Sequence, residues 1–124
     1  MKKNIIANTK KEGERAERLA EHFLTTKGLR KLARNYGCRF GEIDLIMQDE
    51  DSIVFIEVRA RKSCQYGGAI ASITYGKQQK IIHAARHFLM VKNIAEKYPV
   101  RFDVVSFDGE PPKLNWIKDA FSVN

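Results

Sequence analysis

The feature that most constrains this sequence is a pair of apolar runs separated by four polar residues. The first run covers residues 41–47 and holds Ile, Leu and Met, and the second covers residues 52–61 and holds Ile, Val and Phe. The stretch between them, Gln48–Asp51, is polar throughout. Two such runs joined by a short polar stretch predict two β-strands connected by a tight turn. The rest of the chain is therefore expected to be organised around this hairpin.

Two acidic residues interrupt the apolar strands, Asp44 in the first and Glu57 in the second. If the turn is centred on residues 50–51, these acids stand opposite each other on one face, with Cβ atoms about 4.5–5.5 Å apart. Arg59 follows on the same face. Adjacent carboxylates repel each other, and a divalent cation such as Mg²⁺ removes that penalty. The same pattern also fits solvated acids, or acids paired with Arg59 and Arg39.

Positive charge is unevenly distributed along the chain. The formal net charge is +7, and the stretch from Val58 to Lys92 contains no Asp or Glu. A clustered positive surface is the expected footprint of a partner with a phosphate backbone, although it also fits a solubilising face. The basic residues of this stretch are Arg59, Arg61, Lys62, Lys77, Lys80, Arg86 and Lys92.

The length of 124 residues predicts one domain covering residues 1–124. No apolar run approaches the roughly 20 residues that a membrane span requires. Residues 1–11 are basic and polar, with too few apolar residues for a signal peptide, so we expect a disordered basic leader. These features favour a cytoplasmic protein without a membrane partner.

A first helix is predicted from Gly13 to Lys27, because apolar residues recur there at helical spacing. Helical geometry places Glu17 at the rim of this apolar stripe. Glu17 could lean over the sheet edge and join the two strand acids, or it could be a solvated residue paired on its own helix.

A second helix is predicted after the N-cap residue Thr74, ending near Lys92. Lys77 falls at one edge of its apolar face and could point along the sheet towards the carboxylates. His83 and His87 have the spacing of a zinc pair, but no Glu follows His83 as the HExxH pattern requires.

The remaining elements complete an α/β fold in the order α-β-β-β-α-β plus a C-terminal segment. A first strand is predicted over residues 29–36, and a flexible loop over residues 62–74. Another strand is expected over residues 101–107, with a final edge segment at residues 114–117. A strand, a long helix and another strand suggest a right-handed crossover and hence a parallel pair in a mixed sheet.

With these motifs in place, the sequence resembles the YraN family of small bacterial proteins along nearly its whole length. The motifs that carry the resemblance are Gly13-x-x-Ala-Glu17-x-x-Ala20, Gly41-Glu-Ile-Asp-Leu-Ile46, Val54-Phe-Ile-Glu-Val-Arg-Ala-Arg61, Tyr66-Gly-Gly-Ala69, Lys77-Gln-Gln-Lys80 and Arg101-Phe-Asp-Val-Val105. The resemblance implies a restriction-endonuclease-like core, close to archaeal Holliday-junction resolvases, with an Asp…Glu-x-Lys site.

Carried over by position, the resemblance implies that Asp44 and Glu57 are metal ligands and that Glu17 is the acid supplied by the N-terminal helix. Arg59 departs from the motif, since it stands where the nuclease pattern has Lys. Arg can hold a phosphate oxygen and stabilise developing charge, but it stays protonated and cannot act as a base. The roles implied for these four residues are catalytic.

Three functions follow as hypotheses. The leading one is a nuclease that uses Mg²⁺, or Mn²⁺, to hydrolyse phosphodiester bonds in branched or damaged DNA. The second is a catalytically weak module that binds nucleic acid through residues such as Arg61, Lys62, Lys77 and Lys80. The third is a protein-interaction scaffold. Because resolvase-like relatives act as dimers, the resemblance also leaves a homodimer open.

Overall fold

The computed structural model describes residues 4–62 and 68–123, with side chains described from residue 11 onward. One five-stranded mixed sheet lies at its centre, with the strands in sequence order across it. The strands are β1 (Arg30–Cys38), β2 (Gly41–Asp49), β3 (Ser52–Arg61), β4 (Val100–Asp108) and β5 (Lys113–Phe121). The helices are α1 (Asn4–Thr26), α2 (Gly68–Ala71) and α3 (Tyr75–Val91). This mixed sheet between helices is consistent with a restriction-endonuclease-like fold.

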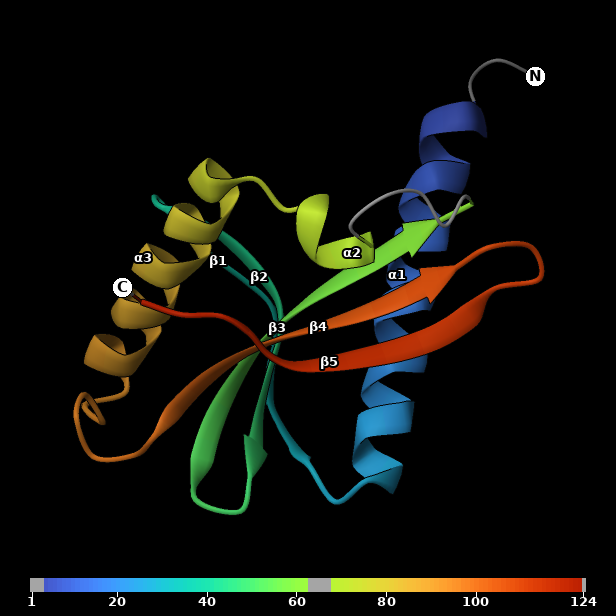
Figure 1. Ribbon diagram of the computed structural model, residues 1–124. Coiled ribbons are helices and arrows are strands. Elements are labelled where there is room, and N and C mark those ends of the chain that lie inside the picture. The colour runs from blue at the N-terminus through green and yellow to red at the C-terminus, as the bar shows by residue number, and fades with distance from the viewer. Residues whose placement is uncertain (1–3, 63–67, 124) are drawn as a thin grey trace.

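Helices cover both faces of the sheet (Figure 1). On one face, buried residues of α1 such as Ala20 and Leu24 pack with Leu45 and Val54. On the other face, buried residues of α3, including Phe88, pack in a second cluster with side chains of β2, β3 and β4. The predicted buried face of the second helix is confirmed, and Thr74 caps that helix as expected by accepting a hydrogen bond from the backbone N–H of Lys77.

The predicted hairpin is confirmed, including its register. Asp49 pairs with Ser52 and Leu45 with Ile56, so the turn is centred on residues 50–51. The β3 and β4 strands are parallel, with Phe55 opposite Phe102, as the crossover rule predicts. β1 and β5 are the two outer strands of the sheet.

Three element boundaries differ from the sequence-based predictions. α1 begins at Asn4 rather than near Gly13, so most of the segment expected to be a disordered leader is helical. The final segment is a full strand from Lys113 to Phe121 and pairs with β4. The loop expected after β3 contains the short helix α2, although residues 63–67, which include part of its Gly pair, lie outside the described residues.

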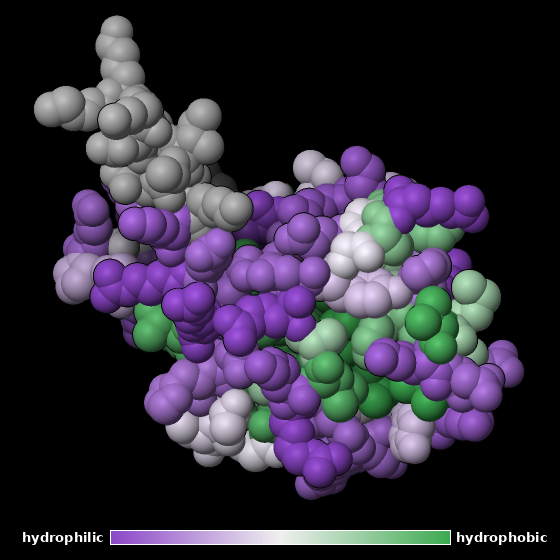
Figure 2. Space-filling view, turned by 180° about the vertical axis from the view of Figure 1, so that it is seen from behind, coloured by the Kyte–Doolittle hydropathy of each residue, from purple (hydrophilic) through white to green (hydrophobic). Residues whose placement is uncertain are grey.

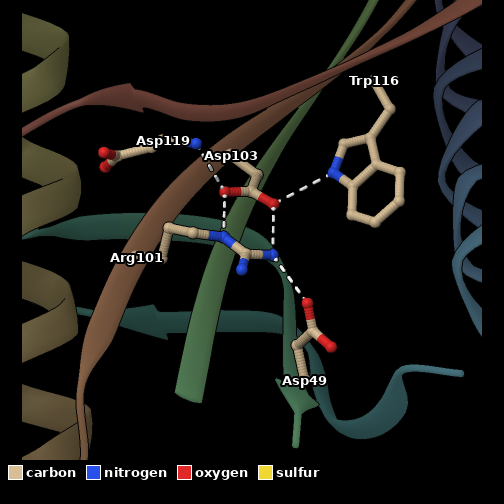
Figure 3. A network of polar contacts seen from close by, with 5 residues as sticks. All are labelled: Asp49, Arg101, Asp103, Trp116 and Asp119. Carbon is tan, nitrogen blue, oxygen red and sulfur yellow. Dashed lines mark hydrogen bonds and ion pairs between the residues drawn. The ribbon is translucent and has the colours of Figure 1, made fainter.

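A buried network of polar contacts joins β2, β4 and β5 on the α1 face of the sheet (Figure 3). The fully buried carboxylate of Asp103 accepts hydrogen bonds from Arg101 Nε at 2.9 Å, from Trp116 Nε1 at 2.9 Å and from the backbone N–H of Asp119 at 3.0 Å. Arg101 also reaches Asp49 at 3.1 Å. Because the buried carboxylate is paired with a guanidinium and accepts further hydrogen bonds, the sheet tolerates its charge.

The surface seen in Figure 2 is mostly hydrophilic, and its apolar side chains gather on the side where α3 lies. Exposed apolar residues of that helix include Met90 and Val91. None of the described helices is long and apolar enough to cross a membrane.

A candidate acidic site at a break in the sheet

The candidate site lies where β2 separates from β3. The hydrogen-bonded ladder between these strands runs from Asp49–Ser52 to Leu45–Ile56 and stops there. One further step of the register would place Asp44 opposite Glu57. At this step the side chain of Asp44 replaces a backbone acceptor, since its Oδ2 accepts a hydrogen bond of 2.8 Å from the backbone N–H of Val58. The strands therefore part at the predicted acidic pair.

The alternation of side chains along β2 is broken at the same point. Ile43 packs in the cluster beneath α3, whereas Leu45, two residues later, packs in the cluster beneath α1. In a regular strand these two side chains would share a face. The regular alternation on which the expected position of Asp44 depended is therefore wrong at this residue, although its expected proximity to Glu57 is correct.

At this break the carboxyl group of Asp44 interacts with those of Glu57 and Glu17. Burial, followed by the neighbouring charge of Glu57 and then that of Glu17, raises the pKa of Asp44 to about 8, against the opposing effect of the Val58 N–H. Burial also raises the pKa of Glu17, whose side chain interacts with those of Asn35 and Asp44. Of the two positions expected for Glu17, the structure shows the one in which its carboxylate leans towards the strand acids.

Two cations stand beside Glu57, which is only 5% exposed. Lys77 Nζ of α3 lies 3.1 Å from Glu57 Oε2, and Arg59 Nε lies 3.4 Å from the same oxygen. Lys77 was expected to bind nucleic acid through its charge, and its position at the carboxylates gives it a second role. Glu57 is therefore neither solvated nor uncompensated.

A cleft lies beside the site on each side of the sheet. A cleft of about 360 Å³ on the α3 side is lined by residues that include Gly41, Lys77 and Lys80. A second cleft of about 240 Å³ on the α1 side is lined by residues that include Glu17 and Asn35. Glu42 lines both clefts. Sequence reasoning missed Glu42 and Asn35 as members of the site.

The other basic residues predicted to bind nucleic acid differ in how they are engaged. Arg61 bonds to Asp108 Oδ1 at 2.9 Å and to the carbonyl oxygen of Gly68 at 3.0 Å, so it links the ends of β3 and β4 to α2. Lys62 and Lys80 are exposed. Arg61 is thus occupied within the fold, whereas the charges of the two lysines face solvent.

The acidic oxygens suit a hard divalent cation in kind. Oε1 of Glu17 is buried and has no hydrogen-bond partner among the described residues, and burial together with the charge of Glu57 raises the pKa of Asp44. As they stand, no three Asp, Glu, His or Cys side chains in the described ranges are grouped to ligate one ion. Mg²⁺ commonly takes only one or two carboxylates, with water and phosphate oxygens completing the shell, so Asp44 and Glu57 fit its requirement.

Comparison with known proteins places the chain in a family. A family model described as "Uncharacterised protein family UPF0102" matches residues 16–107. The chain belongs to this family. The matched UPF0102 residues include α1 from Ala16 onward and both strands of the acidic hairpin, so the family region contains Glu17, Asp44 and Glu57.

The UPF0102 relatives span nearly the same length as this chain. A UPF0102 protein of Legionella pneumophila (strain Corby) is 50% identical over 113 residues, covering 91% of this chain and 96% of the relative. One from Saccharophagus degradans is 50% identical over 119 residues, covering 96% and 99%. One from Aeromonas hydrophila is 45% identical over 119 residues, covering 95% and 90%. The names of these relatives give their membership of UPF0102 and no activity.

Proposed function

We propose that this UPF0102 protein is a metal-dependent nuclease that hydrolyses phosphodiester bonds in DNA at the break between β2 and β3. The observation that carries the proposal is the meeting of Glu17, Asp44 and Glu57, which come from three separate elements, with Lys77 and Arg59 alongside. Acids and cations gathered beside two clefts match the needs of a phosphate, which requires positive charge, and of a divalent cation, which requires oxygen ligands.

Asp44 and Glu57 would hold Mg²⁺, or Mn²⁺, and Glu17 would orient the ligands from the α1 side. A bound Mg²⁺ would supply Lewis-acid activation of the attacking water and neutralise charge on the phosphate. In the reaction, a water oxygen forms a bond to phosphorus, the bond from phosphorus to the leaving oxygen breaks, and that oxygen takes up a proton.

Arg59 would hold a phosphate oxygen rather than accept a proton, because guanidinium remains charged. Its Nε is buried 3.4 Å from Glu57 Oε2, so a phosphate would be held through the other nitrogens of the guanidinium. Lys77 reaches the site from α3 and can donate hydrogen bonds to the same phosphate. The two cations would stabilise the charge that develops as the phosphorus is attacked.

A second function has one specific observation in its favour. Lys77 and Arg59 both lie against Glu57, where they compensate its charge without a metal. A site balanced in this way could bind phosphate and turn over slowly or not at all. In that case the protein would be a nucleic-acid-binding module on a nuclease scaffold.

The deciding experiment incubates the purified protein with branched, single-stranded and duplex DNA in Mg²⁺ or Mn²⁺ and separates the products on denaturing gels. Cleavage by the wild type that falls by about 100-fold or more in Asp44→Asn and in Glu57→Gln supports the nuclease. The matched controls are Asp51→Asn and Glu12→Gln, which change the same kinds of group at exposed positions outside the site.

Two results would count against the nuclease. If no substrate is cut with either ion while DNA is still bound, the result supports the nucleic-acid-binding module instead of the nuclease. If cleavage persists unchanged in both site variants, the activity belongs to another part of the molecule or to a contaminant.

A further inference from the structure

An exposed aromatic residue stands at the turn between β1 and β2, beside the cleft on the α3 side. Phe40 is 37% exposed, and the guanidinium of Arg39 lies 4.9 Å from the centre of its ring. The ring of His83 from α3 lies 5.7 Å away at an interplanar angle of 33°, and the ring of His87 lies 6.2 Å away. An exposed aromatic held among a guanidinium and two imidazoles presents a flat surface that suits a further planar group.

This aromatic group is fixed in place by its neighbours. Gly41, the next residue, has φ +153° and packs so closely on α3 that an added Cβ would lie 3.4 Å from the Cβ of Lys80. On the other side, the hydroxyl of Tyr36 is hydrogen-bonded to Nδ1 of His87. The same hydrogen bond and the edge-on contact with Phe40 engage His87 within the fold.

The aromatic group is connected to the acidic site by side chains of α3. Lys77, Lys80 and His83 follow at intervals of three residues, so each neighbours the next along a path that winds part of the way around the helix. Lys77 contacts Glu57, Lys80 packs on Gly41, and His83 stacks against Phe40. At a rise of about 1.5 Å per residue, the six steps from Lys77 to His83 span about 9 Å, which is about three stacked nucleotides at 3.4 Å each.

The charge along this path fits a phosphate backbone. The stretch from Val58 to Lys92, which includes all of α3, contains no acidic residue. A strand whose phosphates lie against Lys77 and Lys80 would carry its next bases towards Phe40. In duplex nucleic acid, both faces of a base are already covered by its neighbours in the stack, whereas an unpaired base can offer a face to an aromatic side chain.

We propose that Arg39, Phe40 and His83 form a stacking site for an unpaired base. The preferred partner is then nucleic acid with an unpaired nucleotide close to the phosphate that Lys77 and Arg59 hold. This inference rests on the proposed function, which gives nucleic acid as the partner, and adds that the partner contains an unpaired nucleotide. Stacking on an aromatic side chain is tolerant of sequence, so the site selects strand structure rather than base identity.

The test measures binding in the absence of divalent cations, so that it does not depend on cleavage. The probes are a fully paired duplex and the same duplex with one unpaired 2-aminopurine, a base whose fluorescence falls when it stacks. The wild type is expected to bind the unpaired probe more tightly and to quench its fluorescence. Phe40→Leu is expected to weaken binding of the unpaired probe by about tenfold and to remove the quenching, with duplex affinity unchanged.

Two further variants separate stacking from a structural effect. Phe40→Tyr retains an aromatic ring and is expected to keep both the preference and the quenching. Tyr98→Leu removes another exposed aromatic residue, 42% exposed and outside this cleft, and is expected to bind as the wild type does. A thermal melt of each variant confirms that it is folded.

Equal loss of affinity for both probes in Phe40→Leu, unquenched fluorescence with the wild type, or no binding of either probe would overturn the stacking site. The outcome is separable from that of the nuclease proposal. A preference for the unpaired probe that depends on Phe40, in a protein that cuts nothing, sustains the stacking site while the nuclease fails. Cleavage without such a preference supports the nuclease and overturns the stacking site.

Discussion

The backbone N–H of Val58 donates a 2.8 Å hydrogen bond to Oδ2 of Asp44 at the position where the ladder between β2 and β3 ends. A side-chain carboxylate thus takes the place of a strand carbonyl. This hydrogen bond satisfies the backbone N–H of Val58 where the strands separate, and both Glu17 and Glu57 lie near the carboxyl group of Asp44. The hydrogen bond that holds Asp44 also opens the site.

Asp44→Asn should stabilise the metal-free protein at about pH 8. Burial and the neighbouring acids raise the pKa of Asp44 from 3.8 to about 8, so between these pH values the folded protein binds more protons than the unfolded chain. The free energy of unfolding therefore falls as the pH rises from about 4 to about 8. We expect the variant to be more stable by about 1–3 kcal/mol at pH 8 and by less at pH 4, as measured by urea denaturation. A benefit that is the same at both pH values, or that Asp51→Asn reproduces, would contradict this assignment.

Mg²⁺ should stabilise the wild type and should do so more strongly at higher pH, because the ion competes with the proton on Asp44. At ten times the dissociation constant the expected gain is about 1.4 kcal/mol, visible as a rise in the thermal midpoint that EDTA reverses. In Asp44→Asn and Glu57→Gln the rise should be absent. A rise of equal size in those variants would place the ion elsewhere.

Lys77→Met and Lys80→Met should have different effects. Both remove one contact to phosphate, so each should reduce the slope of log affinity against log salt concentration by about 1. Only Lys77 touches Glu57, so only its loss should also lower the rate of cleavage at saturating DNA, by about tenfold or more. Salt titrations and single-turnover assays check the two effects. Lys97→Met is the exposed control, and a change in rate for Lys80→Met as large as that for Lys77→Met would refute the distinction.

Asp103→Asn should destabilise the protein by about 3–5 kcal/mol, because it leaves Arg101 in the sheet with an incomplete partner. Asp119→Asn is a close control, since Asp119 contributes only its backbone N–H to this network. Urea denaturation should place the control within about 0.5 kcal/mol of the wild type. If the two variants lose similar stability, the buried carboxylate is less important to the sheet than its contacts indicate.

The sequence was sufficient to predict the hairpin and its register, because alternating apolar residues and a four-residue polar turn restrict the pairing of residues 41–61. Helical spacing also predicted that Lys77 would lie at the edge of α3 that faces the carboxylates. Both features depend on periodicity within a short segment. The pattern therefore identified Asp44, Glu57 and Lys77 as neighbours without any information on the fold.

Features that depend on contacts between distant segments could not be predicted in the same way. The break at Asp44 arises because Ile43 packs under α3 while Leu45 packs under α1, and strand alternation gives no sign of it. Asn35 enters the site from β1, where its positive φ of 53° turns it out of the regular strand pattern. Arg61 appeared to be a free charge because its partner Asp108 lies 47 residues away.

The basic residues of the outer strands have a consequence for how the protein behaves at high concentration. β1 carries Arg30, Lys31 and Arg34, and β5 carries Lys113 and Lys118. An outer strand offers unpaired backbone groups to which a strand of another molecule could add, and closely spaced like charges make that addition unfavourable. Sheet-to-sheet aggregation should therefore be suppressed in dilute salt and should become easier as added electrolyte screens these cations.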